Sequence, residues 1–165
     1  MDTGENKLYI PGSYIKGEQF EDYVRKNIFI KDYYTIVERT HGYLQNKGDF
    51  IESSTKPDFK FRDKINNREF FIEAKFRSDF YNKNTLLWCG SNQLKIYQEC
   101  NRIIPVFIAL GVHGKASNPE LLFLVPVTED IKTELLMPAI NKFKISTGKP
   151  VLPDVLWEYL KSFNL

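Results

Sequence analysis

Two short segments in the middle of the chain alternate apolar and polar residues, and this period of two constrains the fold most. In 58–63, Phe59 and Phe61 occupy one set of alternate positions and charged residues occupy the other. In 69–77, four apolar residues share alternate positions, namely Phe70, Ile72, Ala74 and Phe76. Period two over this length predicts two half-buried strands. The Asn66-Asn67 pair between them favours a tight turn with positive φ and so predicts an antiparallel hairpin.

The polar face of this hairpin gathers residues with catalytic chemistry. Closing the hairpin at Asn66-Asn67 places Lys60 opposite Glu73 and Asp58 opposite Lys75. Because directly opposed residues of an antiparallel pair point to the same face, we expect Asp58, Glu73 and Lys75 to share it. A four-residue loop preserves this parity, whereas a slip of one residue sends the polar residues of the two strands to opposite faces.

Two carboxylates beside a lysine fit metal-assisted hydrolysis of a phosphodiester. Magnesium prefers oxygen ligands and keeps several waters, so Asp58 and Glu73 would anchor it and the backbone carbonyl of Ala74 would add a third oxygen. The metal would activate a bound water, and Lys75 would orient that water or stabilise the charge developing on phosphorus. The same residues also fit a plainer interpretation, a solvated sheet face with cross-strand ion pairs worth about 0.2–1 kcal/mol each.

Apolar periodicity and turn residues predict the other elements. A stripe of Phe20, Val24 and Ile28 indicates a first helix, and continuous apolar runs indicate buried strands. The expected elements, in chain order, are a helix at 17–30, a strand at 33–40, a loop over most of 42–57, the hairpin, a helix at 90–102 with Ser91 as N-cap, strands at 105–112 and 121–127, and helices at 128–137 (N-cap Thr128) and 154–163. This order predicts an α/β sandwich with a mixed sheet.

Length and composition narrow the class of protein. The chain of 165 residues suits one domain, with a core at about 17–127 and a helical extension at 128–165, and its 42% hydrophobic content argues against disorder. Cys89, Cys100, His41 and His113 lack the spacing of a zinc site. No run of about 18 apolar residues occurs, so we expect no membrane span and a cytoplasmic protein. The net charge of +2 decides nothing, but 56–77 holds seven basic and four acidic residues.

The combination of Pro57-Asp58 with Glu73-Ala74-Lys75 resembles the signature of the PD-(D/E)xK nuclease superfamily. The resemblance implies a three-layer, restriction-endonuclease-like α/β/α sandwich around a mixed central sheet. It also implies that Asp58 and Glu73 ligate magnesium and that Lys75 is catalytic.

Two helical segments extend the resemblance, which covers roughly 17–112. Residues 17–21 resemble the first helix of the family, whose glutamate joins the metal site; Glu21 is the expected residue and Glu18 the second choice. Gln93 and Tyr97 resemble the Q-x-x-x-Y motif of RecB-like members. At a spacing of four residues they share one helix face, from which they would contact nucleic acid near the metal.

These observations predict a magnesium-dependent deoxyribonuclease in which Mn²⁺ would substitute for Mg²⁺. Lys60 and Arg77 are candidate phosphate contacts, and the resemblance makes a homodimer or a larger nuclease complex plausible. The first alternative is a catalytically inactive nucleic-acid-binding module on the same fold. The second is an unrelated interaction domain that binds neither DNA nor metal. The sequence distinguishes neither endonuclease from exonuclease action nor DNA from RNA preference.

Overall fold

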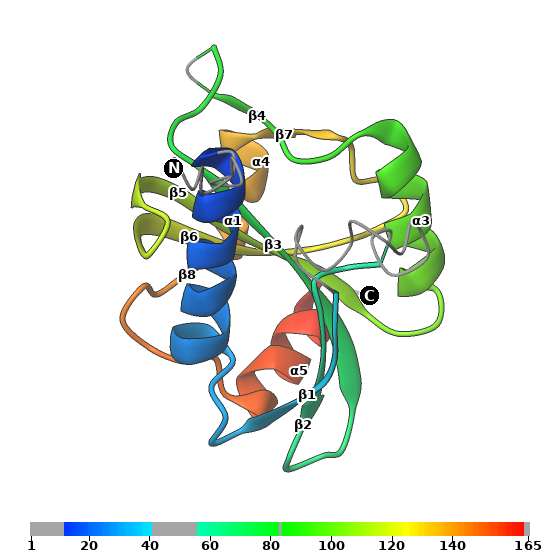
Figure 1. Ribbon diagram of the computed structural model, residues 1–165. Helices are drawn as coiled ribbons and strands as arrows, with labels where there is room; N and C mark the ends of the chain where they lie inside the picture. The colour runs from blue at the N-terminus through cyan, green and yellow to red at the C-terminus, as the bar shows by residue number, and fades with distance from the viewer. Residues whose placement is uncertain (1–11, 41–55, 83, 164–165) are drawn as a thin grey trace, which may run out of the picture.

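The structure, a computed structural model, describes residues 12–40, 56–82 and 84–163. A twisted sheet forms its centre, with six strands in the order β1-β2-β3-β5-β6-β8 (Figure 1). β3 and β5 run parallel and the other neighbours run antiparallel, so the sheet is mixed, as predicted. Its strands are β1 (Tyr34–Arg39), β2 (Phe59–Asp63), β3 (Glu69–Arg77), β5 (Val106–Lys115), β6 (Asn118–Pro126) and β8 (Lys144–Ile145).

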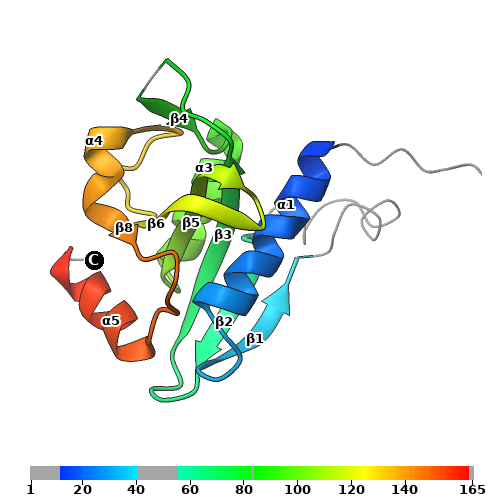
Figure 2. The same ribbon diagram turned by 90° about the vertical axis from the view of Figure 1, so that its left-hand side faces the viewer.

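Helices α1 (Gly12–Tyr23) and α5 (Pro153–Ser162) cover one face of the sheet, as Figure 2 shows. A π-helical turn, η1 (Val24–Ile28), continues α1, and the predicted stripe of Phe20, Val24 and Ile28 is buried against the sheet. The helix predicted at 17–30 is therefore confirmed, although it begins earlier and changes its winding at Val24. The helices in 12–40, 56–82 and 84–163 are all too short or too polar to cross a membrane.

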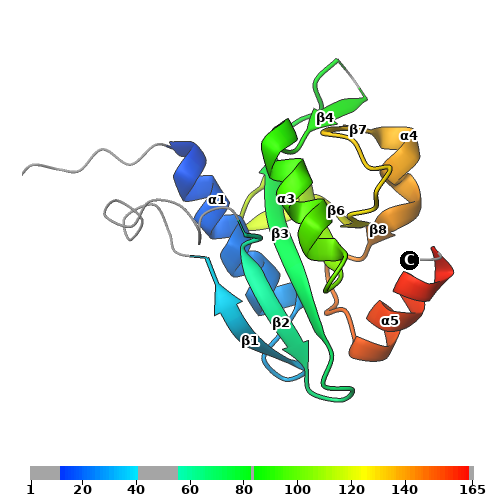
Figure 3. The same ribbon diagram turned by 90° about the vertical axis from the view of Figure 1, so that its right-hand side faces the viewer.

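Helix α3 (Ser91–Asn101) lies over the other face of the sheet (Figure 3). It begins after Gly90, which is its N-cap, so the prediction of Ser91 as N-cap is wrong by one residue. A two-stranded ribbon of β4 (Thr85–Leu87) and β7 (Glu134–Leu136) completes this layer with α4 (Met137–Ile140) and the 3-10 turn η2 (Asn141–Phe143). The three layers agree with the predicted sandwich.

The helix predicted at 128–137 is wrong, because β7 forms within that segment. Leu135 of β7 lies opposite Leu86 of β4, and both side chains are buried. The pairing with β4 outweighs the local helical spacing, as tertiary contacts often do. Pro138 stands at the start of the short α4, where its missing N–H costs nothing. Residues 42–55 of the predicted loop, and His41 before it, lie outside the described residues.

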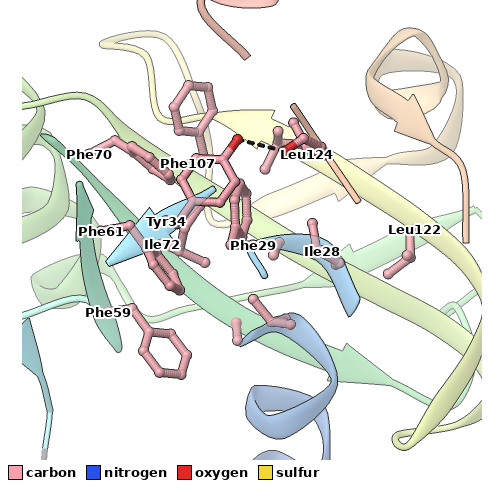
Figure 4. Close-up of a cluster of buried hydrophobic side chains, with 14 of the residues drawn as sticks. Ile28, Phe29, Tyr34, Phe59, Phe61, Phe70, Ile72, Phe107, Leu122 and Leu124 are labelled. Carbon is pink, nitrogen blue, oxygen red and sulfur yellow. Dashed lines mark hydrogen bonds between the residues drawn. The ribbon is translucent and has the colours of Figure 1, made fainter. Parts of the chain in front are cut away.

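One apolar core lies on each side of the sheet. The core beneath α1 and α5 is rich in aromatic rings, and Figure 4 shows Phe29, Phe61 and Phe70 among them. The ring centroids of these three residues lie 5.3–5.7 Å apart. The core beneath α3 contains Phe71, an apolar residue among the charged alternate positions of β3. Thus β3 is buried on both faces rather than on one, because α3 covers the face that periodicity predicted to be solvated.

The β2–β3 hairpin forms with the predicted faces but a different register. Phe59 lies opposite Ile72 and Lys60 opposite Phe71, a shift of two residues from the predicted pairing. A shift of two preserves the parity of the faces, and it brings Asp58 level with Glu73 instead of Lys75. Asn67 has a φ of 58°, the positive value expected of this turn.

Candidate active site

Asp58 and Glu73 meet where β2 begins beside the middle of β3. The backbone N–H of Ala74 donates to Oδ2 of Asp58 at 2.8 Å, and the backbone N–H of Asp58 donates to Oε2 of Glu73 at 3.2 Å. Each carboxylate is therefore held by the backbone of the opposite strand. Glu73 is only 3% exposed, so its charge is almost entirely removed from water.

Lys75 supplies the cation beside this pair. Its Nζ lies 3.1 Å from Oε1 of Glu73, and its side chain is more exposed than that of Glu73. Lys75 stands two residues after Glu73 on β3, and the strand period places both side chains on one side of the sheet. The structure thus brings together the three residues predicted to be catalytic, with the lysine on the side nearer solvent.

A third carboxylate approaches from α1. Glu21 interacts electrostatically with Asp58 and also pairs with Arg39 of β1, at 3.4 Å. Glu18, the second choice, instead accepts a hydrogen bond from the hydroxyl of Tyr14 at 2.9 Å on the exposed side of the helix. The structure therefore favours Glu21 of the two. Arg39 went unrecognised in the sequence, because its contact with Glu21 depends on how α1 packs on the sheet and leaves no local spacing signal.

The electrostatics of this group favour an additional positive charge. Burial, then the nearby carboxylates of Glu73 and Glu21, raises the pKa of Asp58 well above its ordinary value, although the N–H of Ala74 opposes this. Burial also raises the pKa of Glu21. Carboxylates that repel one another in a partly dry site are stabilised by a proton or by a cation.

Tyr97 of α3 lies behind Glu73, within the core beneath α3. It is 1% exposed and stacks on Trp88, with ring centroids 5.8 Å apart. The side-chain amide of Gln93 donates to the Tyr97 hydroxyl at 2.7 Å. Burial and the charge of Glu73 raise the pKa of Tyr97. The two residues of the Q-x-x-x-Y pattern do share a helix face, but Tyr97 is beneath the surface, where it contacts the site and not the solvent.

The two predicted phosphate contacts on the sheet are engaged within the protein. Lys60 pairs with Glu38 at 3.5 Å and with Glu69 at 3.2 Å. Arg77 donates to the carbonyl of Leu87 at 3.0 Å and to the carbonyl of Phe76, the preceding residue of β3, at 2.9 Å. Arg77 thus ties the end of β3 to β4. Contact of either residue with nucleic acid stays a prediction.

The donor set of the site fits a hard divalent cation. The described residues contain no group of three or more His, Cys, Asp or Glu residues arranged to hold a metal ion. Magnesium is usually bound by one or two protein carboxylates, its other positions being filled by water and substrate phosphate. Asp58 and Glu73 supply two such carboxylates, and their mutual repulsion favours a bound cation. Glu21 and the Ala74 carbonyl stay predicted ligands.

Comparisons with known proteins bear on the fold. No model of a protein family matches the chain, and no curated protein matches it. Six chains of solved structures match, among them Hjc, a Holliday junction resolvase from Archaeoglobus fulgidus. That match has a TM-score of 0.53 and 12% identity, and it covers 86% of this chain and 98% of the other. This chain therefore has a restriction-endonuclease-like α/β fold built on a mixed central sheet.

Proposed function

We propose that this protein is a metal-dependent nuclease that hydrolyses DNA phosphodiester bonds at Asp58, Glu73 and Lys75. The observation that carries the proposal is the reciprocal pairing of two carboxylates across the β2–β3 hairpin, with a lysine 3.1 Å from one of them. A solvated sheet face would leave such ion pairs exposed, whereas Glu73 is almost fully buried. Burying charge is costly, so a fold that retains it here favours a chemical role over a structural one.

Each residue has a distinct part in the proposed reaction. Asp58 and Glu73 would hold Mg²⁺ or Mn²⁺ through carboxylate oxygens, and the backbone carbonyl of Ala74 would add a third oxygen. When bound, the metal supplies Lewis-acid activation of water and of the phosphate. Lys75 neutralises Glu73 in the free protein and stabilises the negative charge that develops on phosphorus. Arg39 restrains Glu21 at the edge of the site.

The substrate class is DNA, and branched DNA belongs among the substrates to be tested. The structural neighbour is described as a Holliday junction resolvase. A four-way junction, a linear duplex and a single strand of matched sequence, incubated with Mg²⁺, Mn²⁺ or EDTA, would rank the three substrate classes.

Cleavage and binding measured on the same variants test the proposal. In Lys75→Ala we expect a loss of about 10²–10³-fold in cleavage rate, with DNA affinity retained, because a single stabilising group of the transition state is removed. Asp58→Asn and Glu73→Gln should abolish metal-dependent cleavage. Lys132→Ala, an exposed lysine far along the chain, is the matched control and should cleave normally. Unchanged cleavage in Asp58→Asn or Glu73→Gln would end the assignment.

One observation favours the alternative of an inactive DNA-binding module. Both carboxylates already accept backbone hydrogen bonds, and no three-residue metal group occurs among the described residues. The module would bind DNA in a salt-dependent manner and would leave every substrate intact with Mg²⁺ or Mn²⁺. Salt-dependent binding without turnover would therefore select it.

A further inference from the structure

Strand β1 forms an outer edge of the six-stranded sheet. Within the described residues its strand neighbour is β2 alone, and Figure 3 shows β1 at the border of the sheet. An edge strand presents unpaired N–H and C=O groups, which form a template for one more strand.

The ladder with β2 shows which residues face outward. The N–H of Lys64 donates to the carbonyl of Tyr33 at 2.9 Å, so the backbone groups of Tyr33 point toward β2. Ile36 lies opposite Phe61 in this ladder. The backbone groups of successive residues point alternately toward and away from the neighbouring strand, so those of Thr35 face β2 and those of Ile36 face the open edge. This alternation holds as far as Ile36, because the register with β2 shifts beyond that residue.

A hollow of about 690 Å³ lies along this edge, between η1 and β1. We call it the basic hollow; its lining includes Arg25, Lys26, Lys31, Lys64, Tyr34 and Ile36. Ile36 is 41% exposed, and its side chain gives the hollow an apolar patch.

Cations outnumber anions around the basic hollow. Four basic residues line it, and Asp32 is the acidic residue among its lining. Arg25 and Lys26 share one further anion, Asp22, at 2.7 and 3.9 Å. The ammonium of Lys64 donates to the carbonyl of Lys31, which keeps these two lysines together.

We propose that the β1 edge and the basic hollow bind an extended acidic segment of a partner protein, which adds to the sheet as a strand beside β1. In this mode backbone hydrogen bonds provide affinity, and pockets for alternate side chains provide specificity. An apolar side chain of the segment would contact Ile36, and acidic side chains would meet the lysines. This role is independent of the proposed nuclease activity.

Two other occupants fit the same surface less well. A second copy paired through β1 would bring two basic hollows together, and like charges oppose that contact. The phosphate backbone of a nucleic acid would satisfy the lysines, but it would use neither the open backbone groups of β1 nor the apolar surface of Ile36.

Fluorescence anisotropy with defined peptides tests the proposal. The probes are labelled peptides of about ten residues in which Glu alternates with Val, Ile, Leu, Phe or Thr, and the negative probes replace Glu with Lys. We expect at least one acidic peptide to bind and no basic one to do so. Lys26→Glu/Lys31→Glu should weaken that binding about tenfold or more. The matched control, Lys115→Glu/Lys132→Glu, changes the net charge equally at exposed positions outside the hollow and should bind normally.

A second variant separates strand addition from simple charge attraction. Ile36→Pro removes an edge N–H, and proline is tolerated at sheet edges, so we expect it to weaken binding while circular dichroism and thermal unfolding confirm its fold. Binding of none of the acidic peptides, or equal binding by both double variants, would overturn the proposal. A dimer in solution that Ile36→Pro dissociates would overturn it in favour of a second copy. DNA binding lost in Lys26→Glu/Lys31→Glu, with peptide binding unchanged, would assign the hollow to nucleic acid.

Discussion

Replacing Asp63 with alanine tests whether one buried carboxylate fixes the hairpin that carries the site. Asp63 is fully buried at the end of β2. Its carboxylate accepts hydrogen bonds from the backbone N–H of Ile65 at 3.0 Å, of Arg68 at 3.3 Å and of Asn66, and from Nε1 of Trp157 at 2.8 Å. It therefore shapes the turn that sets the β2–β3 register and also anchors α5.

The cost of Asp63→Ala follows from the surroundings of these donors. A hydrogen bond to a charged group contributes about 1.5–3 kcal/mol. The turn residues are exposed, so their N–H groups regain water, whereas Trp157 is 5% exposed and its indole N–H loses its acceptor. We therefore expect a loss of about 3–5 kcal/mol, a large part of the roughly 5–15 kcal/mol that stabilises a typical domain.

Urea unfolding followed by circular dichroism measures this loss. Trp157→Phe removes the indole donor and keeps a ring beneath Arg68, whose guanidinium lies 3.8 Å from the Trp157 ring centroid, so it should cost about 1–2 kcal/mol. The double variant should be less destabilised than the sum of the two, because both remove one shared hydrogen bond. A loss below about 1 kcal/mol in Asp63→Ala, or strict additivity, would refute this explanation of the register.

Three further predictions concern the packing and chemistry around the site. A Cβ on Gly111 would lie 2.6 Å from the ring of Phe20, so Gly111→Ala should cost about 1–3 kcal/mol in urea unfolding, and adding Phe20→Leu should recover part of it. Burial raises the pKa of the Cys89 thiol to about 11. In Cys100→Ser, where Cys89 is the remaining cysteine, iodoacetamide should therefore alkylate Cys89 at pH 8 roughly a hundredfold more slowly than a free thiol. The protonated thiol stabilises the fold below about pH 8.5, and this contribution to the free energy of unfolding should fade as the pH rises through 11. Tyr97→Phe keeps the stacked ring but removes the hydroxyl behind the site, so kcat should fall about tenfold with DNA affinity unchanged; an equal loss of affinity would contradict a positioning role.

The sequence was sufficient to predict the faces of the hairpin, because alternation is a local property of a strand. Phe59 and Phe61 point into the aromatic core, and Asp58 meets Glu73 on the polar side. The register could not be read from Asn66-Asn67 alone. The carboxylate of Asp63 organises a longer turn there, and its indole partner lies 94 residues further along the chain.

Other failures of sequence reasoning also arise from distant contacts. Leu135 joins a strand because Leu86 lies opposite it, and Tyr97 is buried because Trp88 and the sheet enclose it. Arg39 reaches Glu21 only once α1 has packed on the sheet. The sequence thus indicated which residues could form the candidate site better than it indicated what surrounds them. The chemistry of a side chain depends on residue type alone, whereas its burial depends on tertiary packing.

The central claim is that Asp58 and Glu73 together hold a hard divalent cation for DNA hydrolysis, and a Mn²⁺ titration followed by electron paramagnetic resonance tests it most directly. We expect the unaltered protein to bind Mn²⁺ and Glu73→Gln to bind it at least about tenfold more weakly. Glu134→Gln, which changes an exposed glutamate, should bind like the unaltered protein. Equal Mn²⁺ affinity in all three proteins would contradict the claim.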